Sequence, residues 1–370
     1  MRILQVIPSL AKGGAERVVV ELSNSLVTLG YKVDILTAFP VDFRLNQNSI
    51  NPKVEVLFLG KKHRSPICSY LKIPIWVARN WKLIKSYDVI HCHLTFGLVF
   101  GFAISVLRKF TNFKKLNLLA TCHVVGVGVN QRPRIINEYF SKFFDSFVLV
   151  AENDSWRDFM SKSGKRNFRV IRNGISPELW ADVNRNIGEK RSIVVGTISR
   201  LEAERKPWLF LEVFAHLHDV TDGQIQFILG GEGPERDKLV SYAKQLGIKE
   251  NLEMPGLVVD PREILALLDI YVGLCVEEIT GVAALEAVFS GIPVVGIQLS
   301  EAYSKGKNDW IYSHQDPKIV ANYIHFLTQN PTEVEKTIIS QKVIGLQNYS
   351  TKRMCSEYVY LYLQGGARPN

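Results

Sequence analysis

The chain has 370 residues, of which 46% are hydrophobic and 22% charged, a composition that excludes a disordered or fibrous protein and is typical of filled globular cores. Its net charge of +9 is uneven, because residues 1–190 carry 28 Lys and Arg against 14 Asp and Glu, whereas residues 191–370 carry 17 against 22. The strongly basic half predicts an anionic ligand or surface as its partner, with a merely solvated basic surface as the alternative.

The first ten residues, MRILQVIPSL, predict a strand at once and show no signal-peptide pattern. The longest apolar run, residues 94–107, has 14 residues, fewer than the roughly 20 that span a bilayer, and predicts a buried helix. The five cysteines are odd in number, scattered and without a CxxC pair, which favours a reducing compartment over a disulfide framework. A cytoplasmic protein is therefore expected.

Short runs of Val, Ile and Leu alternate with helical patterns from the start, which predicts parallel sheets with helical crossovers. A helix is expected from Gly14 to Leu29, and Gly30 should end it. The strands expected in the first half of the chain are residues 2–8, 33–38, 54–59, 88–92, 116–121 and 146–151.

A polar stretch at residues 176–191 predicts a linker, because it combines Pro, Asn, Gly and charged side chains. Strands are then expected at residues 192–199, 226–231, 251–256, 269–274 and 292–297. The chain is thus predicted to be α/β, with doubly wound Rossmann-like domains at residues 1–180 and 190–345 that face each other across a cleft. Ligands of such sheets bind at the carboxyl ends of the strands, so this cleft is the expected site.

Glycines follow several of the predicted strands. Gly13 and Gly14 lie between the first strand and the first helix, where they would let a ligand approach the backbone N–H groups. Gly231 lies at another strand end, in LGGEGPERDKL, whose spacing is not that of the dinucleotide motif GxGxxG. Simple turns are the alternative interpretation of these glycines.

Two cations follow the predicted strand at residues 192–199. Arg200 ends the strand, and Lys206 lies near the start of the next helix. Together they would neutralise a diphosphate, Arg through its planar fork and Lys as a point charge. The sequence has no DxD motif, so no divalent metal is expected to help, and an exposed basic loop is the alternative.

The stretch CVEEITGVAALEAVFSGIPVVG, residues 275–296, predicts a helix over Gly281–Phe289 with Thr280 as its N-cap and Gly291 at its end. The N–H groups of a helix N-terminus bind anions. Phosphate is therefore expected at the amides of Gly281, Val282 and Ala283.

Two carboxylates flank this predicted helix N-terminus. Glu278 lies on the preceding loop and Glu286 within the helix, and both are suited to accept hydrogen bonds from hydroxyls. Burying them without such partners would be costly. Phosphates together with hydroxyls indicate a nucleotide sugar as the ligand.

Histidines end two of the predicted strands. His91 and His93 lie two residues apart, and His123 follows Cys122 at the start of a glycine-rich segment. A zinc site from these four residues is conceivable, but no CxxC or helix-spaced ligand pair supports it. Structural histidines satisfied by the backbone are the plain reading of His91 and His93, and His123 is the better active-site candidate.

The sequence resembles the retaining glycosyltransferases of family 4, which have the two-domain GT-B fold. The resemblance rests on GGAERVVVELSNSLVTLGYKVDILT, RNGI, GTISRLEAERKP, LGGEGPERDKL and EEITGVAALEAVFSGIPVV. The tail YSTKRMCSEYVYLY is similar to the terminal helix of the family, which returns to the first domain, here at about residues 350–365. The Arg200–Lys206 and Glu278–Glu286 pairs occur in the order of the family.

The resemblance implies roles for these residues one by one. Arg200 and Lys206 would hold the donor diphosphate, Glu286 the ribose hydroxyls and Glu278 the donor sugar. The amides after Thr280 would meet phosphate, and His123 would lie near the reacting sugar. Gly13 and Gly14 would lie in the loop of the first domain beside the phosphate and acceptor, and Gly231 would help to bind the donor. The family usually has an aromatic residue where Thr280 stands, so the resemblance implies the helix start and the phosphate site but not the shape of the sugar pocket.

The implied reaction is metal-independent transfer from a nucleotide sugar, UDP-linked or alternatively GDP-linked, by front-face departure of the phosphate. Its acceptor would be a lipid-linked or polysaccharide chain in cell-surface glycan synthesis. The segments at residues 61–85 and 108–115 mix Lys and Arg with aromatic residues, which predicts peripheral attachment to the inner face of the cytoplasmic membrane.

Three other readings stay open beside the transferase. The first is an epimerase or hydrolase of nucleotide sugars, and the second is a non-catalytic nucleotide-sugar-binding protein. The third reads the basic stripe as nucleic-acid binding, but no nucleic-acid motif accompanies it.

Overall fold

The chain folds as two compact units, and each is described by itself. The first comprises Met1–Gly174 and Thr351–Asn370, and the second comprises Ile175–Ser350. The computed structural model describes residues 1–10, 13–38, 50–60, 66–111, 116–123, 131–151, 168–181, 183, 192–276, 279–299 and 310–364. Among these residues, no helix is both long and apolar enough to cross a bilayer.

The unit boundary lies at Gly174, before the stretch that was predicted as a linker. Ile175 and Trp180 are buried in a core of the second unit. The N–H of Ile175 donates to the carbonyl of Tyr349, also in the second unit, at 3.0 Å. Residues 175–180 are therefore part of the second unit, and α13 (Thr351–Gln364) belongs to the first.

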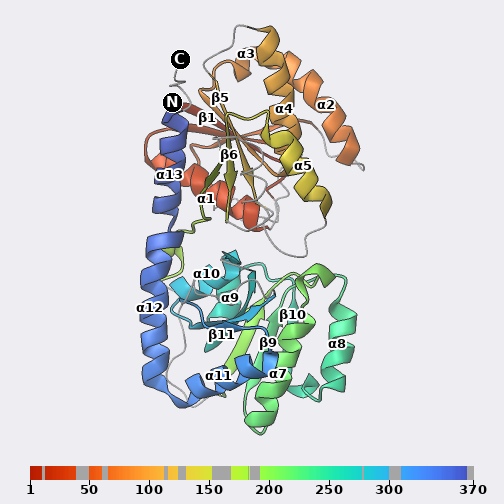
Figure 1. Cartoon of the computed structure of the whole chain (residues 1–370), viewed down its shortest axis with the longest axis vertical. Coiled ribbons are helices and arrows are strands. Elements are labelled where there is room, and N and C mark those ends of the chain that lie inside the picture. The colour runs from red at the N-terminus through yellow and green to blue at the C-terminus, as the bar shows by residue number, and fades with distance from the viewer. Residues whose placement is uncertain are drawn as a thin grey trace. The chain divides into compact units, whose positions relative to one another are not determined.

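The first unit contains one parallel sheet of seven strands in the order β3-β2-β1-β4-β5-β6-β7. Figure 1 shows this sheet with helices on either side of it. All six strands expected in this half of the chain are present. The strands are β1 (Arg2–Ile7), β2 (Lys32–Thr37), β3 (Glu55–Phe58), β4 (Val89–His93), β5 (Asn117–Cys122), β6 (Ser146–Leu149) and β7 (Phe168–Val170).

Two apolar cores cover the two faces of this sheet, because alternate residues of a strand point to opposite faces. Leu4 and Val6 of β1 pack with α2 (Pro66–Arg79) and α4 (Leu94–Phe110), whereas Ile3 and Ile7 pack with α1 (Gly14–Thr28) and α13. The remaining helices of the unit are α3 (Trp81–Ile84) and α5 (Gln131–Ser141).

The apolar run at residues 94–107 lies within α4, a helix that packs on the sheet, as expected. Its close approach depends on Gly97, where a Cβ would lie 2.9 Å from the carbonyl oxygen of Val6. α1 ends as predicted, since Gly30 has a φ of 85° that glycine adopts without strain.

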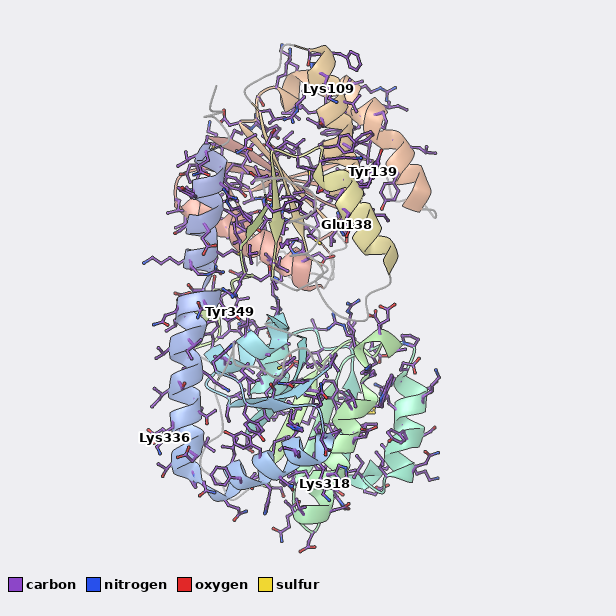
Figure 2. The ribbon with its side chains drawn as sticks, in the orientation of Figure 1. Lys109, Glu138, Tyr139, Lys318, Lys336 and Tyr349 are labelled. Carbon is purple, nitrogen blue, oxygen red and sulfur yellow. The ribbon has the colours of Figure 1, made fainter. Side chains whose placement is uncertain are left out.

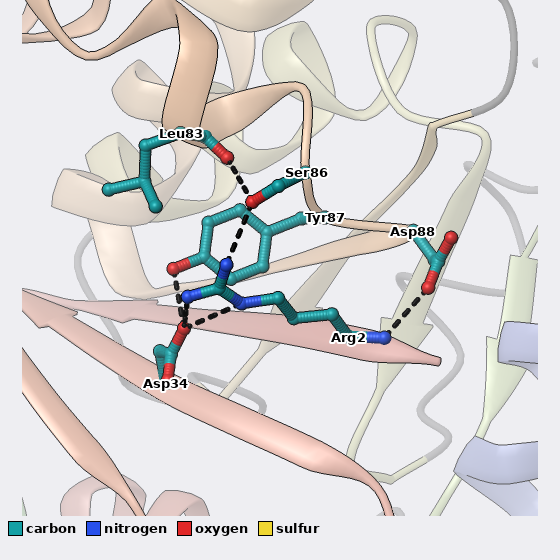
Figure 3. A network of polar contacts seen from close by, with 6 residues as sticks. All are labelled: Arg2, Asp34, Leu83, Ser86, Tyr87 and Asp88. Carbon is teal, nitrogen blue, oxygen red and sulfur yellow. Dashed lines mark hydrogen bonds and ion pairs between the residues drawn. The ribbon is translucent and has the colours of Figure 1, made fainter.

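A polar network ties the amino ends of the strands together (Figure 3). The carboxylate of Asp34 accepts from Nε and Nη2 of Arg2 at 3.1 and 2.7 Å and from the hydroxyl of Tyr87 at 2.6 Å. The backbone N–H of Arg2 donates to Asp88 at 2.7 Å, and its Nη1 donates to Ser86 at 2.9 Å. The network links β1, β2 and the turn before β4, at the end of the sheet opposite to the strand carboxyl ends.

The second unit contains a second seven-stranded sheet, with the order β10-β9-β8-β11-β13-β14 and β12 paired with β11. All pairs are parallel except β11 with β12. The five predicted strands are present, and the short β12 and β14 were not predicted. The strands are β8 (Val194–Ile198), β9 (Gln226–Gly230), β10 (Leu252–Gly256), β11 (Ile270–Val276), β12 (Ile279–Thr280), β13 (Val294–Gln298) and β14 (Ser313–His314).

Helices again cover both faces of the second sheet. Phe214 of α7 stacks on Phe227 of β9, with ring centroids 4.8 Å apart, in one core. Charged side chains lie outside these cores, such as Lys318 on α11 and Lys336 on α12 (Figure 2). The helices are α7 (Trp208–Val220), α8 (Arg236–Gln245), α9 (Pro261–Leu265), α10 (Val282–Phe289), α11 (Pro317–Gln329) and α12 (Pro331–Tyr349).

Removal of the Asp34 carboxylate should destabilise the first unit. We expect Asp34→Ala to lower its free energy of unfolding by about 2 kcal/mol, because a buried Tyr87 hydroxyl and the Arg2 guanidinium lose their shared acceptor. Urea denaturation followed by circular dichroism measures this. Glu357→Gln, which removes a partly exposed ion pair with Arg353, is the control and should cost less than about 0.5 kcal/mol. Equal effects of the two variants would contradict the role of the network.

Candidate functional site

The first unit places two groups of predicted site residues at strand carboxyl ends. Gly13 is the N-cap of α1, the helix that follows β1, and Gly14 begins this helix. A Cβ on Gly13 would lie 2.2 Å from Oε2 of Glu16, so a larger residue there would displace this side chain. Gly13 thus leaves room for the Glu16 carboxylate beside the first turn of α1.

His123 directly follows β5, next to the end of β4. Its Nε2 lies 2.9 Å from Nδ1 of His93, and Nε2 of His93 lies 2.7 Å from Oε1 of Gln5. Nδ1 and Nε2 of His91 contact the hydroxyls of Tyr362, at 2.8 Å, and Thr121, at 2.7 Å. The three histidines therefore belong to one buried polar network.

Both ring nitrogens of His91 and of His93 are engaged in this network, by side chains rather than by the backbone. Neither ring has a nitrogen left for a metal ion. Within the described residues there is also no group of three His, Cys, Asp or Glu side chains that could hold one. The zinc alternative from the sequence is therefore not supported by the geometry.

Burial keeps these histidines neutral. The pKa values of His91 and His93 are well below the usual range, first because burial disfavours the charged form and then because the neighbouring rings would repel it. Burial lowers the pKa of His123 to about 4. At neutral pH, His123 can accept or donate a hydrogen bond but carries no positive charge.

The second unit brings together the loops after β8 and β9. The N–H of Ser199 donates to Gly230 at 2.9 Å, and that of Leu201 donates to Glu232 at 3.0 Å. Gly231 has a φ of 135°, and a Cβ there would lie 1.9 Å from the carbonyl oxygen of Ser199. This glycine therefore has a structural task, since it lets the β8 loop that carries Arg200 cross the β9 loop at backbone contact.

The β8 loop carries three cations, of which sequence reasoning named two. Arg200 is 60% exposed at its side chain and pairs with Glu202 at 3.0 Å. Lys206 is exposed and adopts a left-handed conformation, φ 45°, at the end of the short 3-10 helix Ala203–Arg205. Arg205 is also exposed, and its pKa is lowered first by partial desolvation and then by repulsion from Arg200. Arg205 is therefore a third cation of this loop, directly before Lys206, and the sequence prediction did not include it.

The helix at residues 281–289 starts one residue later than predicted. The N-cap is Gly281 rather than Thr280, because Thr280 is held in β12 by antiparallel pairing with Cys275 of β11. The first hydrogen bonds of α10 are those of Ala284 and Leu285 to the carbonyl of Gly281, at 3.0 and 3.4 Å. The helix therefore provides no acceptor for the N–H groups of Gly281, Val282 and Ala283, as the anion-site prediction requires.

Glu286 lies in α10, one turn after Val282, and is completely buried. Glu278 lies outside the described residues, and so does the side chain of Thr280. Arg200, Gly231 and the start of α10 follow β8, β9 and β11, which are neighbours in the sheet. Gly13 and His123 follow β1 and β5, which flank β4 in the other sheet. Each unit thus has its own group of predicted site residues at the carboxyl ends of its strands.

Acid should unfold the first unit through its neutral histidines. Their pKa in the unfolded chain is about 6.5 and is lower in the folded state, so the stabilisation is present above pH 6.5 and is lost as the pH falls. Each buried histidine should lower the free energy of unfolding by about 1.4 kcal/mol for every pH unit below 6.5. We expect a lower Tm at pH 5.5 than at pH 7.5 in scanning calorimetry.

His91→Gln removes one of these titrating groups and serves as the comparison. Its Tm should depend less steeply on pH than that of the unchanged chain. A Tm that is equal at pH 7.5 and pH 5.5 in the unchanged chain would show that the histidines do not titrate on unfolding.

Comparisons with known proteins agree on the family. The model of Glycosyltransferase Family 4 matches residues 12–179, and that of Glycosyl transferases group 1 matches residues 181–342. The poly(ribitol-phosphate) alpha-N-acetylglucosaminyltransferase of Staphylococcus aureus is 24% identical over 173 residues, 46% of this chain. This chain spans only 35% of the length of that relative.

Two further proteins align over most of the chain. The N-acetylgalactosamine-N,N'-diacetylbacillosaminyl-diphospho-undecaprenol 4-alpha-N-acetylgalactosaminyltransferase of Campylobacter jejuni is 23% identical over 70% of each chain. The crystal structure of Anabaena HepE in complex with UDP and glucose has a TM-score of 0.74 and 19% identity, over 97% of this chain and 98% of that one. The chain belongs to glycosyltransferase family 4 and has the GT-B fold of two Rossmann-like domains.

Proposed function

We propose that this protein transfers a sugar from a nucleotide-sugar donor to a lipid-linked or polysaccharide acceptor in cell-surface glycan synthesis. UDP-sugars are the expected donors and GDP-sugars the alternative. The observation that carries the proposal is that the β8 loop, with Arg200, Arg205 and Lys206 beside Glu202 and Glu204, follows a strand that neighbours β11, the strand that leads to α10. The UDP in the Anabaena structure and the undecaprenol in the name of the Campylobacter relative support the choice of donor and acceptor.

The chemistry follows from where charge develops. Cleavage of the bond between sugar and phosphate produces an oxocarbenium-like centre and a diphosphate leaving group, so positive potential fixed in advance lowers the barrier most. Arg200, Arg205 and Lys206 supply full charges, and the amides of Val282 and Ala283 supply hydrogen-bond donors. The binding of the diphosphate to these groups would need no divalent metal.

The sugar and ribose hydroxyls are assigned to carboxylates. Glu286 lies one turn after the amides of the α10 N-terminus, and the family resemblance assigns it to the ribose hydroxyls. Glu278 would bind the donor sugar, as the family resemblance implies. We expect retention of the anomeric configuration, with the leaving phosphate accepting the proton of the acceptor hydroxyl on the same face.

Removal of single cations should slow turnover. We expect Arg200→Ala and Lys206→Ala each to lower kcat about 100-fold or more, because the developing diphosphate charge loses a fixed partner. Arg205→Ala tests the third cation in the same assay. The measurement is the release of the nucleoside diphosphate from a panel of UDP-, GDP- and ADP-sugars. Each assay is run once without and once with a metal chelator.

Lys336→Ala is the matched control, since Lys336 is an exposed cation on α12 that pairs with Glu333. Its turnover should equal that of the unchanged chain. Near-native kcat in both Arg200→Ala and Lys206→Ala would contradict the diphosphate assignment. Loss of activity in chelator would contradict the metal-independent reaction.

Attachment to the inner face of the cytoplasmic membrane is the second part of the proposal. The outer face of α2 exposes two aliphatic side chains, Leu71 at 71% and Ile75 at 54%. Arg79 at the end of the same helix and Lys82 after it are also exposed. Phe110, at the end of α4, is 82% exposed beside Lys109 (Figure 2). Apolar side chains next to cations are suited to an anionic bilayer surface.

Charges on the outer face of α2 should prevent membrane binding. We expect the unchanged protein to float with vesicles that contain anionic lipid, and the double variant Leu71→Asp with Ile75→Asp to bind at least about tenfold less, because each aliphatic contact is worth roughly 1.5–3 kcal/mol. Ile339→Asp, at an exposed aliphatic residue of α12, is the control. No preference of the unchanged protein for anionic vesicles would refute this attachment.

A further inference from the structure

A chain of buried polar side chains runs through the core of the first unit from α13 to His123. It joins residues that are far apart in sequence, since His91 and Tyr362 are separated by 271 positions. Its members are Gln5 of β1, His91 and His93 of β4, Thr121 of β5, His123, and Tyr358 and Tyr362 of α13.

These side chains share one face of the sheet. Gln5 pairs in register with His91, and His93 pairs with Thr121. All four are less than 2% exposed, on the face that α13 covers. Polar groups in such a place are stable only when each has a hydrogen-bond partner, and the tyrosine hydroxyls of α13 complete the set.

The amide of Gln5 fixes the direction of every hydrogen bond in the path to His123. Its Oε1 can only accept, so Nε2 of His93 must donate across the 2.7 Å contact. That distance is at the short end of the range for an N–H to oxygen hydrogen bond, which is consistent with the amide oxygen, rather than the amide nitrogen, of Gln5 facing His93. The amide nitrogen of Gln5 then donates to the hydroxyl of Tyr362, at 3.4 Å.

The direction of the His93 hydrogen bond to Gln5 also determines the direction of the hydrogen bond between the rings of His93 and His123. A neutral His93 that donates through Nε2 has its lone pair on Nδ1, so it must accept from Nε2 of His123 at 2.9 Å. Nδ1 of His123 is then left as an acceptor. This atom is buried, and no described residue bonds to it.

The other side of the network provides an acceptor for the Gln5 amide nitrogen in this orientation. The Tyr362 hydroxyl accepts from Gln5 and donates to Nδ1 of His91, which in turn donates through Nε2 to Thr121. Without the Tyr362 hydroxyl the Gln5 amide could rotate, and rotation would reverse each donor in the path. Tyr358 contacts Thr121 beyond this path, at 2.9 Å.

We propose that Gln5, His93 and Tyr362 are positioning residues that hold His123 in its Nε2–H tautomer, so that Nδ1 is a fixed acceptor for a sugar hydroxyl. The choice of a sugar hydroxyl as the ligand rests on the glycosyltransferase function proposed above. The tautomer of His123 does not depend on that function. His123 then acts as a neutral hydrogen-bond acceptor that orients the sugar, rather than as a group that takes up a proton. The terminal helix, through Tyr362, sets the chemistry of a residue in another part of the unit.

Two-bond 1H–15N correlation spectra of protein labelled with 15N-histidine test the tautomer directly. His123 is identified by the signals that are lost in His123→Asn. We expect the Nε2–H pattern at pH 7.5, unchanged at pH 6. An Nδ1–H pattern, or a mixture of both forms, would overturn the proposal.

Variants at the two sides of the network test the positioning. Tyr362→Phe and, independently, Gln5→Met should make the Nδ1–H tautomer of His123 detectable. Tyr358→Phe is the matched control on the same helix, and its His123 pattern should stay that of the unchanged protein. A His123 pattern unaffected in both Tyr362→Phe and Gln5→Met would overturn the proposal.

Kinetics separate positioning from mere stability. We expect Tyr362→Phe to lower kcat about tenfold, with less than a twofold change in the donor KM, and Tyr358→Phe to leave both constants unchanged. Equal kcat in the two variants would contradict a role of Tyr362 in catalysis. The spectra need no turnover, so a chain that uses no nucleotide sugar would refute the proposed function while the tautomer result still stands.

Discussion

The structure of the first unit depends on the hydrogen bonds between the face of its sheet and α13. Gln5, His91 and Thr121 occupy strand positions that would normally hold apolar residues. Their polar atoms would be unpaired if only apolar side chains covered them, and each unpaired group costs about 1–3 kcal/mol. Tyr358 and Tyr362 supply aromatic rings that fill the core and hydroxyls that complete the bonds. A single helix therefore provides both packing and polar partners.

In the second unit the corresponding constraint is steric. The loops after β8 and β9 cross so closely that Gly231 and Gly233 leave no space for a Cβ against Ser199 and Leu201. This contact fixes the course of the β8 loop, and the loop in turn fixes the three cations. The position of the cations therefore depends on two glycines, which have no side chain. α10 contributes through its backbone amides, which follow the short strand β12.

Much of the fold could be predicted from local patterns in the sequence. The buried parallel strands read as short runs of Val, Ile and Leu, and Gly30 ended α1 where it was expected. The features that were predicted wrongly depend on pairing with a second segment. β12 is only two residues long, and because it pairs with β11, the N-cap of α10 is Gly281 instead of Thr280. Glycines and cations at strand ends were visible as candidates, but Arg205 was passed over beside Lys206. The partners of the histidines could not be found, because 271 positions separate His91 from Tyr362.

The discontinuity of the first unit has a consequence for its synthesis. The chain leaves this unit at Gly174, completes the whole of Ile175–Ser350, and returns with α13. During translation the sheet face around Gln5 and His91 thus remains without its tyrosine partners until the last helix has emerged. The second unit is continuous in sequence and can fold earlier. The first unit can then complete its folding only after the second unit has been synthesised.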